Sequence, residues 1–192
     1  MPSHHQRRPR PRGTARHHPE HHLRHPGADT VNTVIPEPIQ LSLHIAIEVC
    51  DRFFTSIDAL DWDAFDTCLA DTVTTDFTAF WGGEPQTTSR AELRATWAAL
   101  FAGFASTQHL VSNYVTHPSD AGLSVHVTFR AAHFGHDPYG SPAWTLYGRY
   151  RIELVADGPE YRISGLHQTP TAGEGNRNIV LLAAAGSRLV SP

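Results

Sequence analysis

Three side chains from separate segments have the chemical types that a proton-transfer site needs: Asp58, His109 and His133. Residues 123–134 alternate apolar and polar types as a strand does, and His133 has the parity of the apolar ones, so its ring is predicted to point inward. His109 shares the inward parity of residues 107–117, and Asp58 follows an apolar helical stripe. Two imidazoles and a carboxylate are therefore predicted to converge on one apolar cavity.

Such a group suits general base catalysis. A carboxylate that accepts a hydrogen bond from one imidazole nitrogen fixes the tautomer and raises the basicity of the other nitrogen. His109, oriented by Asp58, is thus predicted to remove a proton from carbon or oxygen, while His133 polarises a carbonyl or protonates a leaving group. One alternative is that these are core histidines satisfied by backbone carbonyls, with Asp58 solvated. Another is an iron site of two histidines and one carboxylate, although the usual short-spaced pair of ligands is missing.

Aromatic residues of the predicted core are also candidates for the wall of that cavity, because ligand pockets use the same residue types. They are Phe77, Phe80, Trp81, Trp97, Trp144 and Tyr150. His126 has the solvent-facing parity, His136 lies in a Gly/Pro loop, and His167 follows the last predicted strand, so the last two are weaker candidates. The sequence has no Gly-rich phosphate loop, Cys-x-x-Cys pair or nucleophile elbow, and no cofactor or metal is predicted.

Helices are expected first along the body of the chain. The spacing of apolar residues predicts a helix over residues 39–57, although its first part also alternates as a strand does. Asp61 is predicted to cap a second helix that extends to Leu69. Ser89 and Glu92 form a capping box for a third helix that ends near residue 103.

A meander of strands follows the helices. Strands are predicted over residues 72–80, 107–117, 123–134, 144–155 and 161–167 from Thr-rich, aromatic or alternating runs that Gly and Pro separate. Helices followed by a meander predict an α+β fold with a mostly antiparallel sheet. The predicted domain covers residues 37–170, and the extension 171–192 is expected to hold a short helix over 178–185.

Composition separates the body from an N-terminal tail. The 192 residues, 40% of them hydrophobic, suit one domain plus tails. Residues 1–30 hold six Arg, seven His and only two acids, whereas the remainder is acidic, which argues against a nucleic-acid groove on the folded domain. The Arg/His/Pro-rich segment 1–36 is predicted to be disordered, with neither a signal peptide nor a membrane span.

The tail leaves three interpretations open. Its His run, residues 17–25, could bind a transition metal adventitiously, the Arg residues could bind an anionic polymer, or translation could begin near Val31. Cys50 and Cys68 fall on apolar helix faces and are predicted to be buried thiols in a reducing compartment, which favours a cytoplasmic location.

Four segments, in their order along the chain, resemble a known family. They read FFTSIDALDWDAFDTCLADTVTTDF, STQHLVSN, AAHF and WTLYGRYRIELV. Over about residues 40–168 the chain resembles the SnoaL-like branch of the nuclear transport factor 2-like superfamily, which includes scytalone dehydratase and a related dehydrochlorinase. The resemblance implies a cone-shaped barrel of three N-terminal helices on a curved sheet, a pocket between the two layers, and a homodimer through the sheet.

The resemblance also implies roles for particular residues. In the dehydratase and the dehydrochlorinase, an Asp at the end of the first helix pairs with a His on the strand after the third helix, and these positions match Asp58 and His109. The second His of the dehydratase matches His133, and Asn113 matches a polar position of the branch. The expected substrate contacts are therefore Asn113 together with the aromatic candidates, apart from Phe80.

Two departures bear on the expected reaction. The dehydratase holds a water molecule with two Tyr residues, and this chain has Ile57 and Phe77 at those positions. The expectation is therefore a cofactor-independent lyase, dehydratase-like, or an isomerase that acts on a small apolar or aromatic molecule by base chemistry. Because one fold hosts many functions, the alternative is a non-catalytic ligand-binding or assembly domain, such as a small subunit that partners an oxygenase.

Overall fold

A long helix begins the described part of the chain. The computed structural model describes residues 37–189, with side chains for residues 41–186, so the predicted tail and its His run lie outside the described residues. The elements are α1 (Glu37–Asp58), α2 (Trp62–Cys68), β1 (Leu69–Asp76), α3 (Thr78–Trp81), β2 (Gln86–Ser89), α4 (Arg90–Phe101), β3 (Ser106–Ser119), β4 (Gly122–Phe134), β5 (Ala143–Asp157), β6 (Glu160–Gly175) and α5 (Asn178–Leu189).

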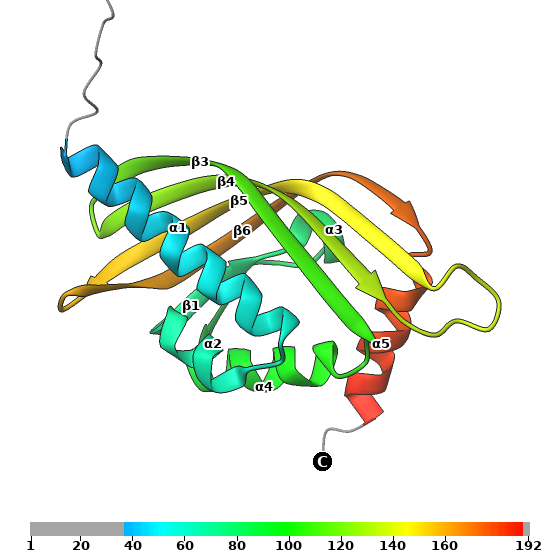
Figure 1. Ribbon diagram of the computed structural model, residues 1–192. Coiled ribbons are helices and arrows are strands. Elements are labelled where there is room, and N and C mark those ends of the chain that lie inside the picture. The colour runs from blue at the N-terminus through cyan, green and yellow to red at the C-terminus, as the bar shows by residue number, and fades with distance from the viewer. Residues whose placement is uncertain (1–36, 190–192) are drawn as a thin grey trace, which may run out of the picture. The chain divides into compact units, whose positions relative to one another are not determined.

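The strands form one curved sheet with the order β2-β1-β6-β5-β4-β3. Every neighbouring pair is antiparallel except β1 and β6, which are parallel. The long strands arch over α2 and α4, and α1 runs beside β3 (Figure 1). The predicted α+β fold with a mostly antiparallel sheet is confirmed, and β2 and β3 are the edges of a sheet that stays open.

The core lies between the inner face of the sheet and the helices. The predicted apolar stripe of the first helix is buried at Cys50, Phe54 and Ile57, so the helical interpretation of this segment is confirmed. On β4 the inward positions from Leu123 to Ala131 are buried and His126 faces solvent, as the alternation predicts. The aromatic centre of this core is Phe53, which packs against Phe54, Phe65 and Trp97.

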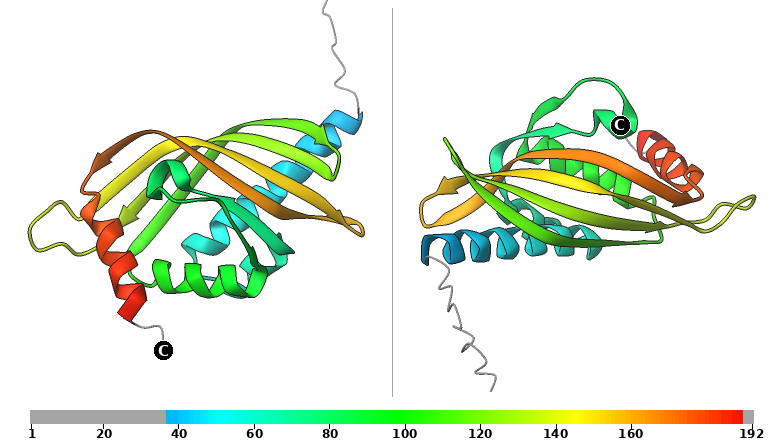
Figure 2. Two further views of the ribbon diagram at one scale, coloured as in Figure 1. Left: turned by 180° about the vertical axis from the view of Figure 1, so that it is seen from behind. Right: turned by 90° about the horizontal axis from the view of Figure 1, so that it is seen from above.

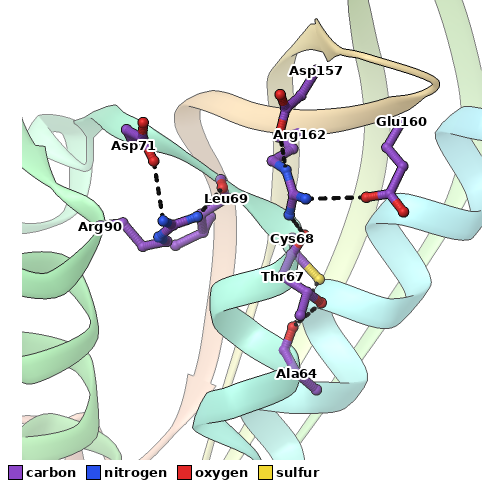
Figure 3. Close-up of polar contacts among 9 residues, drawn as sticks. All are labelled: Ala64, Thr67, Cys68, Leu69, Asp71, Arg90, Asp157, Glu160 and Arg162. Atoms are coloured by element: carbon purple, nitrogen blue, oxygen red, sulfur yellow. Dashed lines mark hydrogen bonds and ion pairs between the residues drawn. The ribbon is translucent and has the colours of Figure 1, made fainter.

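The corner between α2 and β1 is held from two sides by arginines. Asp61 caps α2 as predicted, but the helix ends at Cys68, and Leu69, predicted to be helical, starts β1 in an extended conformation. Arg162 donates to the carbonyl of Thr67 and to acids of the β5–β6 hairpin, while Arg90 donates to the carbonyl of Leu69 (Figure 3). These backbone contacts tie the end of α2 to β6 and the start of β1 to α4.

The predicted strand 72–80 is wrong in its second half. β1 ends at Asp76, whose carboxylate accepts hydrogen bonds from the backbone N–H and the hydroxyl of Thr78. This local turn stops the strand and starts α3, with Phe77 at its N-cap. The four-residue strand β2 was not predicted, because its sequence is short and wholly polar.

The inward parity predicted for β3 fails beyond Ser112. The pairing of β3 with β4 shifts between Ser112 and Val115, and Asn113 adopts a left-handed φ of 57°. This bulge reverses the facing of the rest of the strand, so Asn113 and Val115 are exposed while Tyr114 is half-buried. The prediction that Asn113 points inward is therefore wrong.

The C-terminal segment joins the same core. The strand predicted over 161–167 continues as β6 to Gly175. Pro170 cannot donate a hydrogen bond to the sheet, but it lies opposite Gly148 at a register shift, where the strand tolerates it. The predicted helix over 178–185 is confirmed and extends as α5 to Leu189. It packs beside α4 and buries Ile179, Val180 and Ala183 (Figure 2).

Both cysteines are buried free thiols, as predicted. Burial raises the pKa of the Cys50 thiol to about 12, which keeps it protonated and unreactive. Within residues 37–189, no helix is both long and apolar enough to cross a membrane.

Candidate active site

The end of α1 places Asp58. The backbone N–H of Asp61 donates to the carbonyl of Ser56 and that of Leu60 donates to Ile57, a Schellman pattern with Leu60 in the left-handed region at a φ of 54°. The helix therefore ends abruptly, close to β3. Asp58 is its last residue, and its carboxylate projects toward Thr107 and His109 of β3.

Three donors hold the Asp58 carboxylate. Oδ1 accepts from Nδ1 of His109 at 2.7 Å and from the hydroxyl of Thr107 at 2.8 Å. Oδ2 accepts from the backbone N–H of His109 at 2.7 Å. The same residue thus donates twice, from its ring and its backbone, which fixes the ring's position relative to the strand.

The geometry determines the tautomer of His109. An ionised carboxylate only accepts hydrogen bonds, so Nδ1 must carry the proton and Nε2 keeps its lone pair. The His109 side chain is 6% exposed and that of Asp58 is 22% exposed, so the dyad is largely shielded from solvent. Phe54 stacks on the imidazole, with ring centroids 5.5 Å apart and planes at 23°.

The environment keeps Asp58 ionised. Burial raises the pKa of this carboxyl, but the hydrogen bonds and charge of His109 and the hydrogen bond from Thr107 lower it more, so the pKa lies below its ordinary value. The ionised carboxylate beside Nδ1 holds a proton on that nitrogen, which leaves Nε2 as the hydrogen-bond acceptor of the neutral ring.

His133 lies close to the dyad but has a different character. Its ring centroid is 5.8 Å from that of His109, edge to face at 84°, and Phe104 packs on it at 5.0 Å. Its Nδ1 is buried without a hydrogen-bond partner in the described part of the chain. Burial and the neighbouring His109 lower the pKa of His133 to about 4, so it is neutral at physiological pH. A neutral ring polarises a carbonyl by donating its N–H but supplies no imidazolium acid.

This pKa predicts a pH dependence of stability. An unfolded chain protonates His133 near pH 6.5, whereas the folded chain does so only near pH 4, so stability falls as the pH drops through this window. The expected loss is up to roughly 3 kcal/mol. Chemical denaturation of the wild type and of His133→Leu at pH 7.5 and pH 4.5 measures it. The variant should lose less stability than the wild type over this range.

Asp58 does not obscure this measurement. The lowered pKa of Asp58 stabilises the folded state, and this contribution is lost only as the pH falls below the ordinary carboxyl pKa of about 4. That range lies below the pH range over which His133 changes the stability. Equal slopes for the wild type and His133→Leu between pH 7.5 and pH 4.5 would contradict the neutral, buried state of His133.

The histidines face a cavity of about 110 Å³. Its lining is mostly aromatic and aliphatic, and consists of Phe54, Ile57, Phe77, Phe80, Trp81, Trp97, Leu100, Phe101, Phe104, His109, Ala131, His133, Trp144, Leu146, Tyr150, Gln168 and Val180. The structure thus brings together on this cavity the imidazoles of His109 and His133 and the five predicted aromatic contacts. Asn113, the remaining predicted contact, lies outside the cavity.

The other histidine candidates lie elsewhere. His136 is exposed, and Nδ1 of His167 lies 3.6 Å from an oxygen of Asp76, away from the cavity. No group of three His, Cys, Asp or Glu side chains in the described chain is placed to hold a metal ion, and the Asp58 carboxylate is already engaged by three donors. The structure therefore does not support the alternative iron site.

Gln168 lines the cavity, although the sequence did not predict it as a site residue. Its amide donates to the hydroxyl of Tyr150 at 2.9 Å across the β5–β6 pair. Burial raises the pKa of Tyr150, so the phenol stays protonated, and because its oxygen accepts from Gln168 its own proton is available to a ligand. The shared parity of Gln168 with buried Leu166 was the available signal, but the predicted strand stopped at His167.

The cavity is closed at one side by α3. Arg177, just before α5, donates to the carbonyl of Phe80 at 2.8 Å and lies 4.5 Å from the centre of its ring. Arg177 therefore holds the Phe80 ring, and the Trp81 ring packs edge-on against Phe80 with the ring centroids 4.9 Å apart. Trp81 itself is nearly half exposed, so this side of the cavity borders solvent.

Comparisons with known proteins agree with this architecture. The sequence pattern of a family described as the SnoaL-like domain matches residues 45–167. A search among curated proteins gives no significant match. Among solved structures, the Kfla4162 protein from Kribbella flavida superposes with a TM-score of 0.68 at 24% identity, over 75% of this chain and 97% of that one.

Two further solved structures share the fold. A putative scytalone dehydratase from Novosphingobium aromaticivorans gives a TM-score of 0.61 at 15% identity, over 72% of this chain and 89% of that one. A hexachlorocyclohexane dehydrochlorinase of type 2 gives 0.60 at 10% identity, over 71% and 90%. At these identities the similarity establishes the shared fold.

Proposed function

Since this chain belongs to the SnoaL-like domain family, of nuclear transport factor 2-like fold, we propose that it is a cofactor-independent lyase or isomerase that acts on a small, mostly apolar molecule. The observation that supports the proposal is the hydrogen bond of 2.7 Å between Asp58 and Nδ1 of His109, a residue that lines a mostly apolar cavity. A catalytic base needs this combination of an orienting carboxylate and a shielded imidazole.

Each residue has a defined role in this reaction. Nε2 of His109 removes a proton from a carbon of the substrate, and Asp58 stabilises the imidazolium that forms. His133 or the Tyr150 hydroxyl donates a hydrogen bond to the oxygen on which negative charge develops. The electron pair then either expels a leaving group, which makes a lyase, or accepts a proton at another carbon, which makes an isomerase.

Neighbouring structures support the choice of substrates for a test. Two of them are described as a putative scytalone dehydratase and a hexachlorocyclohexane dehydrochlorinase. A suitable panel is single-ring ketones, β-hydroxyketones and chlorinated cyclohexanes, followed by NMR in D₂O for solvent deuterium at the acidic carbon and for elimination products. The proposal expects turnover by the wild type that His109→Ala loses.

A binding or assembly domain is the second candidate. It predicts that a compound of the panel binds in the cavity without deuterium exchange or elimination, and that His109→Ala changes only the affinity for that compound.

The homodimer through the sheet stays a prediction. Leu110 and Val115 are exposed on the edge strand β3, which is compatible with it.

A further inference from the structure

A second cavity adjoins the one that holds the dyad. It has a volume of about 410 Å³, against about 110 Å³ for the first. Four side chains line both cavities and so form the partition between them: Phe77, Trp81, Trp97 and Leu100. The two spaces therefore meet along a single aromatic wall.

The second cavity differs from the first in its chemistry. Besides the partition it is lined by Thr75, Gln86, Thr88, Leu93, Thr96 and Ala184. Thr75 pairs with Gln86, and Val73 with Thr88, so one face of the β1–β2 pair turns these polar side chains toward α4. Thr74 and Thr87 hydrogen-bond to each other at 2.9 Å on the opposite face.

Among the residues that the structure describes, no acidic or basic side chain lines the second cavity, and the titratable groups that line the first are the two imidazoles and the Tyr150 phenol. A charged group placed in the first space would lose hydration without gaining a counter-ion, whereas the second space borders solvent at the exposed residues Gln86 and Thr96. Hydroxyl and amide side chains instead exchange hydrogen bonds with an uncharged polar ligand. The lining thus selects hydroxyl-bearing or amide-bearing groups.

The volumes limit what each space can hold. A cavity of about 150 Å³ in another protein accommodates benzene, so the space beside His109 holds about one six-membered ring. A substrate larger than a single ring extends beyond this space, either toward solvent beside Trp81 or toward the neighbouring cavity along the shared wall.

We propose that the substrate has two parts: a single-ring head beside His109 and an uncharged, hydroxylated tail in the cavity lined by Thr75, Gln86 and Thr96. This assignment rests on the proposed function for the position of the head. The second cavity is then a specificity site, which distinguishes ring compounds by the group attached to them.

The test compares the affinity of two probes, phenol as the head alone and phenyl β-D-glucoside as head plus hydroxylated tail, by isothermal titration calorimetry on the full chain. The wild type is expected to bind the glucoside about tenfold more tightly, the equivalent of about 1.4 kcal/mol. Thr96→Phe, which fills the second cavity from α4, should remove this advantage while phenol binds as before. Thr75→Val, which removes a hydroxyl without changing size, should reduce it.

The matched control is Ala95→Phe, which adds the same ring at the neighbouring, exposed position of α4. It should leave both affinities unchanged. Equal affinities of the wild type for the two probes would overturn the proposal, as would a glucoside advantage that survives Thr96→Phe.

The binding test can fail independently of the proposed function, because calorimetry measures affinity and requires no turnover. If the glucoside binds more tightly than phenol but His109→Ala leaves turnover unchanged, the second binding site stands and the catalytic proposal is wrong. If His109→Ala abolishes turnover but the two probes bind equally, the catalytic proposal stands and the second binding site is wrong.

Discussion

Replacing His109 with alanine is expected to lower kcat/KM for the reaction found in the substrate panel by about 10²–10⁴-fold, the usual contribution of a positioned general base. The expectation follows from the position of His109 in the cavity wall, where Asp58 holds Nδ1 at 2.7 Å and leaves Nε2 as the proposed base. Because the missing interaction belongs to the transition state, kcat should fall far more than KM rises. Steady-state kinetics of purified wild type and variant give this comparison.

A control variant separates the loss of the base from a general disturbance of the sheet. His126→Ala removes an imidazole from β4, on the solvent-facing side, and should leave kcat/KM unchanged. Circular dichroism should show the same secondary structure in both variants. Comparable rates for the wild type and His109→Ala would remove this residue from the chemistry.

Replacing Phe53 with alanine is expected to have the largest effect on stability, a loss of about 3–5 kcal/mol. Phe53 is fully buried and contacts Phe54, Phe65 and Trp97, so truncation leaves a cavity at the centre of the aromatic core. Two of these neighbours, Phe54 and Trp97, also line the cavity beside the dyad, so the variant should bind phenol more weakly. Urea denaturation gives the free energy of unfolding.

Because a domain has only about 5–15 kcal/mol of total stability, Phe53→Ala could fail to fold, and Phe53→Leu is then the measurable variant, with a loss of roughly 1–2 kcal/mol. Leu41→Ala, on the exposed side of the same helix, is the control and should change the free energy of unfolding by under about 0.5 kcal/mol. Similar losses for Phe53→Leu and Leu41→Ala would show that Phe53 is not at the centre of the core.

The parts of the fold that follow from periodicity could be predicted from the sequence. The alternation of β4 and the apolar stripe of α1 are long enough to specify which face of each element is buried. From these buried faces it could be predicted that Asp58, His109 and His133 lie close together. Ser89 and Glu92 form the predicted capping box at the start of α4. These signals are local, and the structure keeps them.

The predictions that were wrong concern features that depend on single backbone conformations or on contacts made elsewhere in the fold. The bulge at Asn113 reverses the facing of β3, and nothing in the local alternation marks the residue at which pairing with β4 will shift. The turn between Asp76 and Thr78 ends a strand that was predicted from Thr and aromatic residues, types that favour extension. Gln168 lies past the predicted end of its strand, because Pro170 conceals the continuation of β6.

The most direct test of the proposed base is the tautomer of the neutral His109 ring, observed by ¹⁵N NMR of the imidazole nitrogens. In the neutral ring we expect a proton on Nδ1, hydrogen-bonded to Asp58, and an unprotonated Nε2. In Asp58→Asn the preference for this tautomer should weaken or be lost. A proton found on Nε2 of the neutral ring in the wild type, or a spectrum that Asp58→Asn leaves unchanged, would contradict the claim that a carboxylate prepares this imidazole as a base.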